Sequence, residues 1–134
     1  MKSIVPYLLF NGNCREAITF YHAAIGGDLH IMPFGDAPGC TPDQKDLVMH
    51  TKLSNGNCII MASDGRPGTP VTAGDNFSVS IDHDSREEQT RIFNALATGG
   101  NVTMPLQDMF WGAHFGMLTD KFGIMWMFNC DNPK

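Results

Sequence analysis

Apolar positions near the start of the chain change their spacing, and each change predicts a new element. Residues 3–10 are mostly apolar and predict a short buried strand, ended by a turn at residues 11–13. The next apolar residues recur three and four positions apart, at Ala17, Phe20, Tyr21 and Ala24. That spacing predicts a helix, which Asn13 and Glu16 cap at its start and the Gly-Gly pair at 26–27 ends.

A β-hairpin is predicted after this helix. A strand is expected at about 28–34, and residues 35–45 contain two prolines and two glycines, a composition typical of a loop. Two apolar runs, residues 46–53 and 58–63, are then joined by a turn that contains Asn-Gly. Apolar runs joined in this way are the usual signal of a hairpin.

The same order of elements begins again after a loop at residues 64–75. Residues 77–82 predict a strand, residues 85–88 carry a capping signal, and the Gly-Gly pair at 99–100 ends the following helix. The apolar face of this helix is expected to consist of Ile92, Phe93, Leu96 and Ala97. Three further strands are expected near 101–109, 113–119 and 124–129.

Two modules of this kind, residues 1–66 and 75–134, are predicted to form one domain over residues 1–134. A module of one helix and four strands leaves one face of its sheet uncovered, so two modules must pair. The predicted fold is α+β, with two paired βαβββ modules that form a curved mixed sheet around a cleft. The concave side between the modules is the expected ligand site.

Alternation along the strand at 77–82 indicates which polar residues reach that side. The residues predicted to face a helix are Phe77, Val79 and Ile81. The other face is expected to carry Asn76, Ser78, Ser80 and Asp82. A wet cleft and an ordinary solvent-exposed sheet face both explain this pattern.

Composition and charge limit the classes of partner. The formal charge of -5, the pI near 5.3 and the lack of a Lys/Arg cluster argue against nucleic acid. No apolar stretch reaches the roughly 20 residues that cross a bilayer, so we expect a cytoplasmic protein without a membrane partner. The four cysteines form no C-x-x-C pair, which argues against a zinc knuckle. The nine methionines suit an irregular core or an adaptable apolar pocket.

His50 is the best candidate for a catalytic group. Alternation along residues 46–53 predicts that the helices are faced by Leu47, Met49 and Leu53. The opposite, cleft-facing side is expected to carry Val48, His50 and Lys52. A histidine there can act as a general base or hydrogen-bond donor, or can simply line the cleft as a polar residue.

Three other side chains have both a functional and a structural interpretation. His114 lies between aromatic residues and either orients a ligand or fills a packed corner. Trp111 offers a flat wall for a planar ligand, although a buried structural role is also common for tryptophan. Asp64 ends a strand and either points into the cleft mouth or caps a turn. His83 is expected to be an exposed, locally hydrogen-bonded residue, and His30 to have a surface or helix-packing role.

With these elements in place, the chain resembles the vicinal oxygen chelate superfamily, the paired βαβββ fold of glyoxalase I, bleomycin-resistance proteins and extradiol dioxygenases. It resembles most the PhnB-like branch, which is catalogued under a 3-demethylubiquinone methyltransferase name. The segments that carry the resemblance are residues 6–21 with the following Gly-Gly, 59–64, 77–82 and 110–129. The last segment, with its W-G, F-G and T-D-x-F-G elements, is the most specific.

The resemblance implies a divalent metal held by His or Glu side chains on the first and last strand of each module. In this chain those positions fall at about Pro6, Met61, Asn76 and Met127. None of them is a histidine or a carboxylate, so we predict that the usual metal site is missing and no cofactor is required. A divalent metal held unconventionally by His50, His114 and Asp64 is the alternative.

The predicted function is therefore small-molecule binding in the cleft between the modules, without an assigned reaction. The alternative is a metal-dependent lyase, isomerase or dioxygenase. Methyl transfer is disfavoured, because the chain lacks a Gly-rich strand-to-helix turn. The resemblance also implies a homodimer. The predicted ligand-binding residues are His50, Asp64, Asn76, Ser78, Ser80, Trp111, His114 and Met127.

Overall fold

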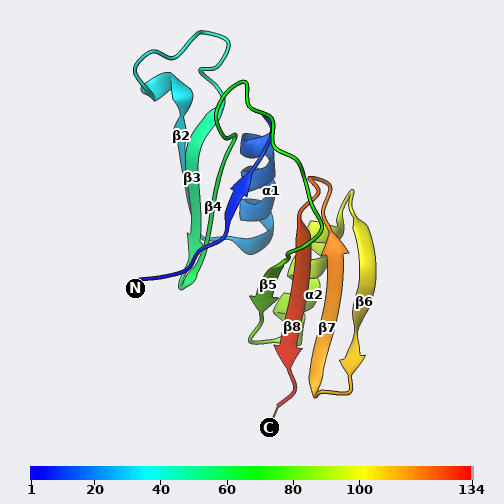
Figure 1. Cartoon of the computed structure of the whole chain (residues 1–134). Helices are drawn as coiled ribbons and strands as arrows, with labels where there is room; N and C mark the ends of the chain where they lie inside the picture. Colours follow the sequence, from blue (N-terminus) through cyan, green and yellow to red (C-terminus); the bar gives the residue numbers. More distant parts are fainter. Residues whose placement is uncertain (134) are drawn as a thin grey trace. The chain divides into compact units, whose positions relative to one another are not determined.

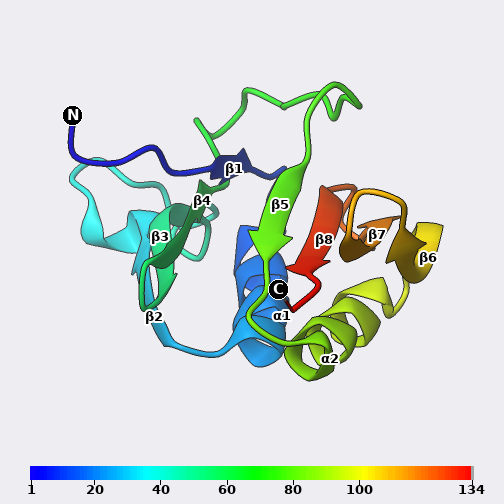
Figure 2. The same cartoon turned by 90° about the horizontal axis from the view of Figure 1, so that it is seen from below.

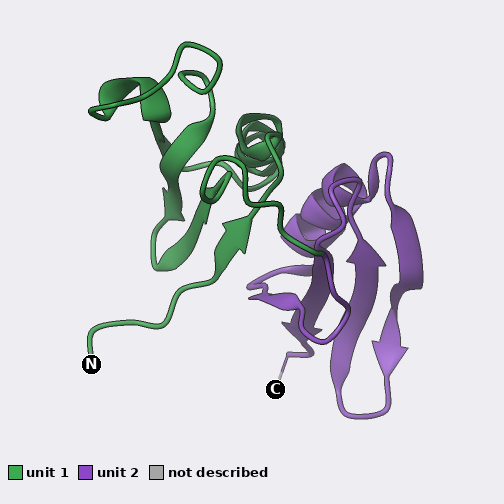
Figure 3. Ribbon diagram, turned by 45° about the horizontal axis from the view of Figure 1, so that its top comes forward, with its two compact units in different colours: residues 1–72 green, residues 73–134 purple. Residues whose placement is uncertain are grey.

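The strands form two four-stranded sheets, one in each half of the chain. In the computed structural model, which describes residues 1–133, the chain divides into two compact units, residues 1–72 and 73–134 (Figure 3). We call them unit 1 and unit 2. The division falls within the loop at residues 64–75, after which the order of elements repeats. No helix among the described residues is long and apolar enough to cross a membrane.

Unit 1 contains one long helix and the first sheet (Figure 1). Its elements are β1 (Tyr7–Leu9), α1 (Cys14–Ile25), β2 (Asp28–Pro33), a short 3-10 helix (Phe34–Asp36), β3 (Val48–Asn55) and β4 (Cys58–Ser63). The strands lie in the order β1-β4-β3-β2. β1 is parallel to β4, and the other neighbouring pairs are antiparallel.

Unit 2 repeats this topology. Its elements are β5 (Val79–Asp82), α2 (Arg86–Ala97), β6 (Asn101–Met109), β7 (Ala113–Thr119) and β8 (Met125–Asp131). The strand order is β5-β8-β7-β6, with β5 parallel to β8 and antiparallel pairs elsewhere. The predicted α+β class and the βαβββ repeat are confirmed.

Each helix covers one face of its own sheet and leaves the other face open (Figures 1 and 2). In unit 1 the buried layer between α1 and the sheet includes Leu8, Ile18, Tyr21, Thr51, Leu53 and Ala62. In unit 2 the corresponding layer includes Ile92, Phe93, Leu96, Leu118, Trp126 and Phe128. We call the uncovered side of each sheet its open face. Residues paired across strands share a face, so the register assigns every strand residue to one side or the other.

The two helices begin differently, and one predicted cap is wrong. Ser85 accepts a hydrogen bond from the backbone N–H of Glu88 at 3.1 Å, as the capping signal predicts. The Asn13 side chain makes no such bond. Instead, Oδ1 of Asp64 accepts hydrogen bonds from the N–H groups of Gly12 and Cys14, both at 2.9 Å. The carboxylate that satisfies the start of α1 therefore comes from a residue 50 positions later in the chain.

A β-bulge changes the predicted face of Val48. The pairing of β2 with β3 shifts register between Met32 and Pro33, and Val48 on the far side of the shift is fully buried. The predicted placement of Val48 beside His50 is therefore wrong, because an extra residue reverses the alternation of side chains. His50 and Lys52 lie on the near side of the shift and stay together on the open face.

Two residues around β5 also differ from the prediction. Phe77, expected to face a helix, lies before the strand and is 61% exposed. His83, expected to be exposed, is buried, with its ring parallel to Phe128 at a centroid distance of 6.0 Å. Because the His83 N–H donates to the carbonyl of Asn129 at 2.7 Å, the chain follows β8 for one more residue and the ring turns inward.

Candidate functional site

The open face of unit 1 carries a row in which phenol, thioether, ammonium and imidazole side chains lie next to one another. The residues paired across the four strands are Tyr7 on β1, Met61 on β4, Lys52 on β3 and His30 on β2. In the next row Leu9 pairs with Ser63 and His50 with Met32. Tyr7, Leu9 and Met32 are among the exposed large apolar residues of the chain. This face therefore combines apolar surface with donor groups.

Tyr7 and His50 are joined on this face. The Tyr7 hydroxyl lies 2.9 Å from Nδ1 of His50, and the two rings stack with centroids 5.7 Å apart. The contact holds both rings in a single arrangement, which reduces the rotamer freedom that a ligand would otherwise have to restrict. Sequence reasoning selected His50 but not Tyr7, since β1 is only three residues long and its alternation is a weak signal.

The corresponding row of unit 2 is less polar. It contains Ser80 on β5, Met127 on β8, Met117 on β7 and Met104 on β6. In the adjacent row the Asn129 side chain donates to the carboxylate of Asp82 at 2.9 Å. Trp111, which is half exposed, packs edge to face against Phe115, whose strand partner is Asn129. Three of the predicted ligand-binding residues, Ser80, Met127 and Trp111, are thus placed at or beside this open face.

His114 lies on the opposite side of this sheet. Its strand partner is Cys130, which is buried with Trp126 and Phe128 on the α2 side. Its Nδ1 lies 3.1 Å from the carboxylate of Asp108, which also accepts a hydrogen bond from Arg86 at 2.7 Å. The predicted ligand-binding residue His114 does not share a face with Ser80 and Met127, because β7 alternates and its open-face residues are the neighbours of His114 in sequence.

The environment of Asp108 lowers the pKa of its carboxyl group. The hydrogen bond from His114 is the largest cause, and the charge of Arg86 and its hydrogen bond add to it. The Arg86 guanidinium also donates to the Asn132 side chain at 2.6 Å, which links the start of α2 to the end of the chain. We interpret this cluster as structural.

Asp64 has a structural role inside unit 1. It is buried, and its two carboxylate oxygens accept three backbone hydrogen bonds, from Gly12, Cys14 and Val48. Burial and the nearby carboxylate together raise the pKa of the Cys14 thiol to about 12, so this thiol stays neutral and unreactive. The remaining predicted ligand residues, Asn76 and Ser78, lie before β5 rather than within it.

The side chains present do not fit the metal site that the resemblance implies. In the observed register, Met61 is paired with Tyr7 and Met127 with Ser80. A phenol, a hydroxyl and two thioethers are poor ligands for a divalent ion that prefers imidazole and carboxylate. Over residues 1–133, no group of three or more His, Cys, Asp or Glu side chains is arranged to hold a metal. The alternative set of His50, His114 and Asp64 is therefore not assembled.

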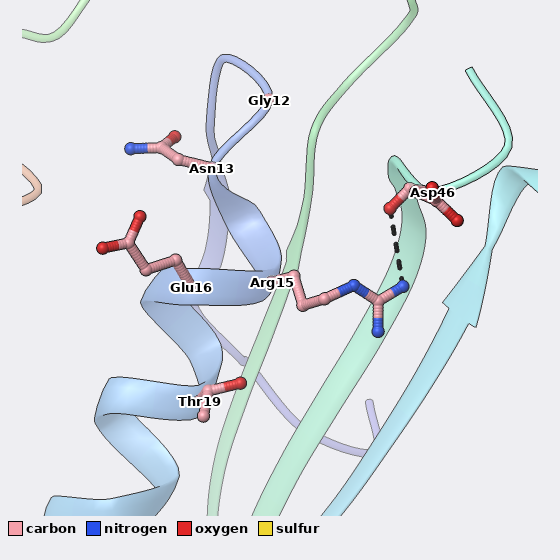
Figure 4. A pocket seen from close by; sticks show the side chains of 6 residues that line it. All are labelled: Gly12, Asn13, Arg15, Glu16, Thr19 and Asp46. Carbon is pink, nitrogen blue, oxygen red and sulfur yellow. Dashed lines mark hydrogen bonds between the residues drawn. The ribbon is translucent and has the colours of Figure 1, made fainter. Parts of the chain in front are cut away.

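A shallow depression lies at the start of α1, on the helix side of unit 1. It is lined by Gly12, Asn13, Arg15, Glu16, Thr19 and Asp46 (Figure 4). Arg15 spans it and donates to the carbonyl oxygen of Asp46 at 3.4 Å. The lining has charges of both signs, and Asp64 already takes two N–H groups of this helix start. We do not place the functional site here.

Comparison with known proteins supports the observed fold. The model of the family described as 3-demethylubiquinone-9 3-methyltransferase matches residues 2–128. The crystal structure of protein PA1353 from Pseudomonas aeruginosa is 50% identical, covers 99% of this chain and 100% of its own, and has a TM-score of 0.90. A PhnB protein from Bacillus cereus is 26% identical, covers 96% of this chain and 99% of its own, and has a TM-score of 0.75.

More distant structures share the fold alone. A glyoxalase/bleomycin-resistance protein from Albidiferax ferrireducens T118 is 16% identical, covers 92% of this chain and 94% of its own, and has a TM-score of 0.63. The match to the family model extends over nearly all of both units. The chain thus belongs to the PhnB-like family described as 3-demethylubiquinone-9 3-methyltransferase, within the glyoxalase/bleomycin-resistance fold.

Proposed function

We propose that this PhnB-like protein binds a small, largely apolar molecule on the open faces of its sheets, without the metal site of its superfamily. The observation that carries the proposal is the open face of unit 1, where Leu9, Met32 and Met61 surround the hydrogen-bonded pair of Tyr7 and His50. Apolar surface with a few fixed polar groups is the usual composition of a small-molecule site.

The second open face supports the same proposal. Met117 and Met127 are directly paired there, and Trp111 packs against Phe115 in the adjacent row. Methionine side chains adapt to ligands of different shape, and an exposed tryptophan offers a flat surface for stacking.

Methyl transfer, which the family's description mentions, is not part of the proposal. A nucleotide-like methyl donor usually binds where a parallel sheet meets a Gly-rich turn before a helix. Both sheets here are mixed and four-stranded. Their strand-to-helix junctions, residues 10–13 and 83–85, lack such a glycine motif.

The proposal includes a homodimer in the cytoplasm. The four free cysteines, Cys14, Cys40, Cys58 and Cys130, are compatible with a reducing compartment. For the assembly, we expect light scattering at micromolar concentration to report a mass near twice the 14.7 kDa of one chain. A mass of one chain under these conditions would contradict the dimer and leave the binding proposal standing.

Binding on the open faces is tested by methyl NMR on protein with labelled methionines. We titrate N-phenyl-1-naphthylamine, a neutral apolar probe, and expect the methyl resonances of Met32, Met61, Met117 and Met127 to shift. The fully exposed Met1 serves as the internal reference and should not move. The enzyme alternative predicts instead that Mn²⁺, which is paramagnetic, broadens the Met61 and Met127 resonances at low concentration.

Two matched variants localise the binding. Leu9→Asn removes an exposed apolar side chain from the open face of unit 1, where it is 47% exposed. Val102→Asn removes one of similar exposure, 43%, whose strand partner Leu118 faces α2. We expect Leu9→Asn to weaken probe binding about fivefold and Val102→Asn to leave it unchanged. Equal effects of the two variants, or no methyl shift in the parent protein, would overturn the proposal.

A further inference from the structure

The polar groups on the open face of unit 1 are nearly all donors. Lys52, His30, His50 and Tyr7 lie on this face in two adjacent rows. Lys52 and His50 are two residues apart on one strand, which places their Cα atoms about 7 Å from each other. The chain as a whole has a formal charge of -5. A face whose polar groups are nearly all donors therefore differs from the acidic average of the chain.

The Lys52 ammonium group is not neutralised by the protein. Its side chain forms no hydrogen bond or ion pair with any of residues 1–133. The carboxylate on the same face, Asp28, pairs with Ser54 one row away and forms no ion pair with Lys52. The charge of Lys52 is therefore available to a ligand at this point of the face.

The pair of Tyr7 and His50 adds a donor in either of its hydrogen-bonding arrangements. If the Tyr7 hydroxyl donates to Nδ1 of His50, the neutral imidazole carries its proton on Nε2 and can donate it outward. If Nδ1 donates to the Tyr7 oxygen, the hydroxyl proton is the one left to donate. In both arrangements the pair keeps one N–H or O–H for a ligand.

The internal repeat shows that the fold does not require these groups. The row Tyr7, Met61, Lys52 and His30 in unit 1 corresponds to Ser80, Met127, Met117 and Met104 in unit 2. Methionines occupy the positions of Lys52 and His30 in an otherwise equivalent sheet. The lysine and histidine side chains of unit 1 are therefore not needed to form the sheet.

We propose that the open face of unit 1 binds small organic anions, in which an apolar body carries a carboxylate or sulfonate group. Lys52 supplies the countercharge, the Tyr7–His50 pair donates a hydrogen bond to an anionic oxygen, and Leu9, Met32 and Met61 contact the apolar body. Charge complementarity selects this ligand class, since a neutral molecule would leave Lys52 without a partner. This inference rests on the proposed small-molecule function and names the class of its ligand.

The experiment compares two probes that differ only in the anionic group. 8-Anilinonaphthalene-1-sulfonate and N-phenyl-1-naphthylamine share one ring system, and both fluoresce when they leave water. We expect the protein to bind the sulfonate about tenfold more tightly. Lys52→Met, which installs the residue found in unit 2, should weaken sulfonate binding about tenfold and leave the neutral probe unaffected.

Two further variants control for net charge and for the tyrosine hydroxyl. Lys45→Met makes the same charge change at an exposed position in the loop between β2 and β3 and should alter neither affinity. Tyr7→Phe removes the hydroxyl partner of His50 and should weaken only sulfonate binding. Both variants should keep the thermal midpoint of the parent protein, because both sites are exposed.

The outcomes separate this inference from the proposed function. If both probes bind with equal affinity, or if Lys52→Met weakens both equally, the anion site is wrong and apolar binding stands. If Lys45→Met has the same effect as Lys52→Met, general charge attraction explains the preference and the inference fails. If neither probe binds, the proposed function itself is wrong.

Discussion

Asp64→Ala is expected to destabilise the protein by about 4 kcal/mol. The buried carboxylate accepts hydrogen bonds from the N–H groups of Gly12 and Cys14 at 2.9 Å and of Val48 at 2.8 Å. Alanine leaves all three donors without a partner inside unit 1, and a lost bond to a charged acceptor costs about 1.5–3 kcal/mol. Urea denaturation should show a midpoint lower by about 2 M.

Two other variants make this result interpretable. Asp43→Ala removes a carboxylate from an exposed position in the loop between β2 and β3 and should shift the midpoint very little. Asp64→Asn keeps the shape and one acceptor oxygen, and should fall between the parent protein and Asp64→Ala. If Asp64→Ala does not fold, the asparagine variant still provides the measurement. A midpoint for Asp64→Ala equal to that of the parent protein would contradict the role assigned to this carboxylate.

Gly27→Ala is the second substitution with a large expected effect. Gly27 has φ of +93° at the junction of α1 and β2, and an added Cβ would clash with the backbone carbonyl oxygen of Ser54. The positive φ costs about 1 kcal/mol for alanine, and the clash with backbone adds about 2 kcal/mol or more. We expect thermal unfolding at a midpoint lower by more than 10 °C, on a scale of about 4 °C per kcal/mol.

Gly56→Ala separates the two contributions to this loss. Gly56 also has a positive φ, +60°, in the hairpin turn between β3 and β4, but no atom lies within 4 Å of an added Cβ. This variant should lose only the conformational part, about 1 kcal/mol. Equal midpoints for Gly27→Ala and Gly56→Ala would mean that the close approach to Ser54 relaxes without cost.

The sequence predicts correctly those features that depend only on residues close together in the chain. The spacing of Ala17, Tyr21 and Ala24 predicted the helix that became α1, and all three side chains are buried. The Asn-Gly turn predicted the hairpin of β3 and β4, and Ser85 caps α2 as expected. Each of these features depends on groups a few residues apart, whose relation is already present in the unfolded chain.

Local predictions were wrong where a residue from a distant part of the chain, or a shift in strand register, decided the outcome. Asn13 is a reasonable cap by sequence, but Asp64 takes that role because folding brings the end of β4 to the start of α1. Alternation assigned Val48 to the face of His50, and a bulge reversed it. Strand register also decided the position of the candidate site residue His114, which shares a hairpin with open-face residues but lies on the α2 side.

The order of residues alone was sufficient for the α+β class, the two helices and the βαβββ repeat, because period and turn chemistry are local properties. The face on which each candidate side chain lies depends on strand register, bulges and pairing between distant segments. Tyr7 and His50 are 43 residues apart in sequence, and no local pattern indicates that they share a hydrogen bond. The donor surface of Tyr7, His30, His50 and Lys52 exists only once four strands lie side by side in register.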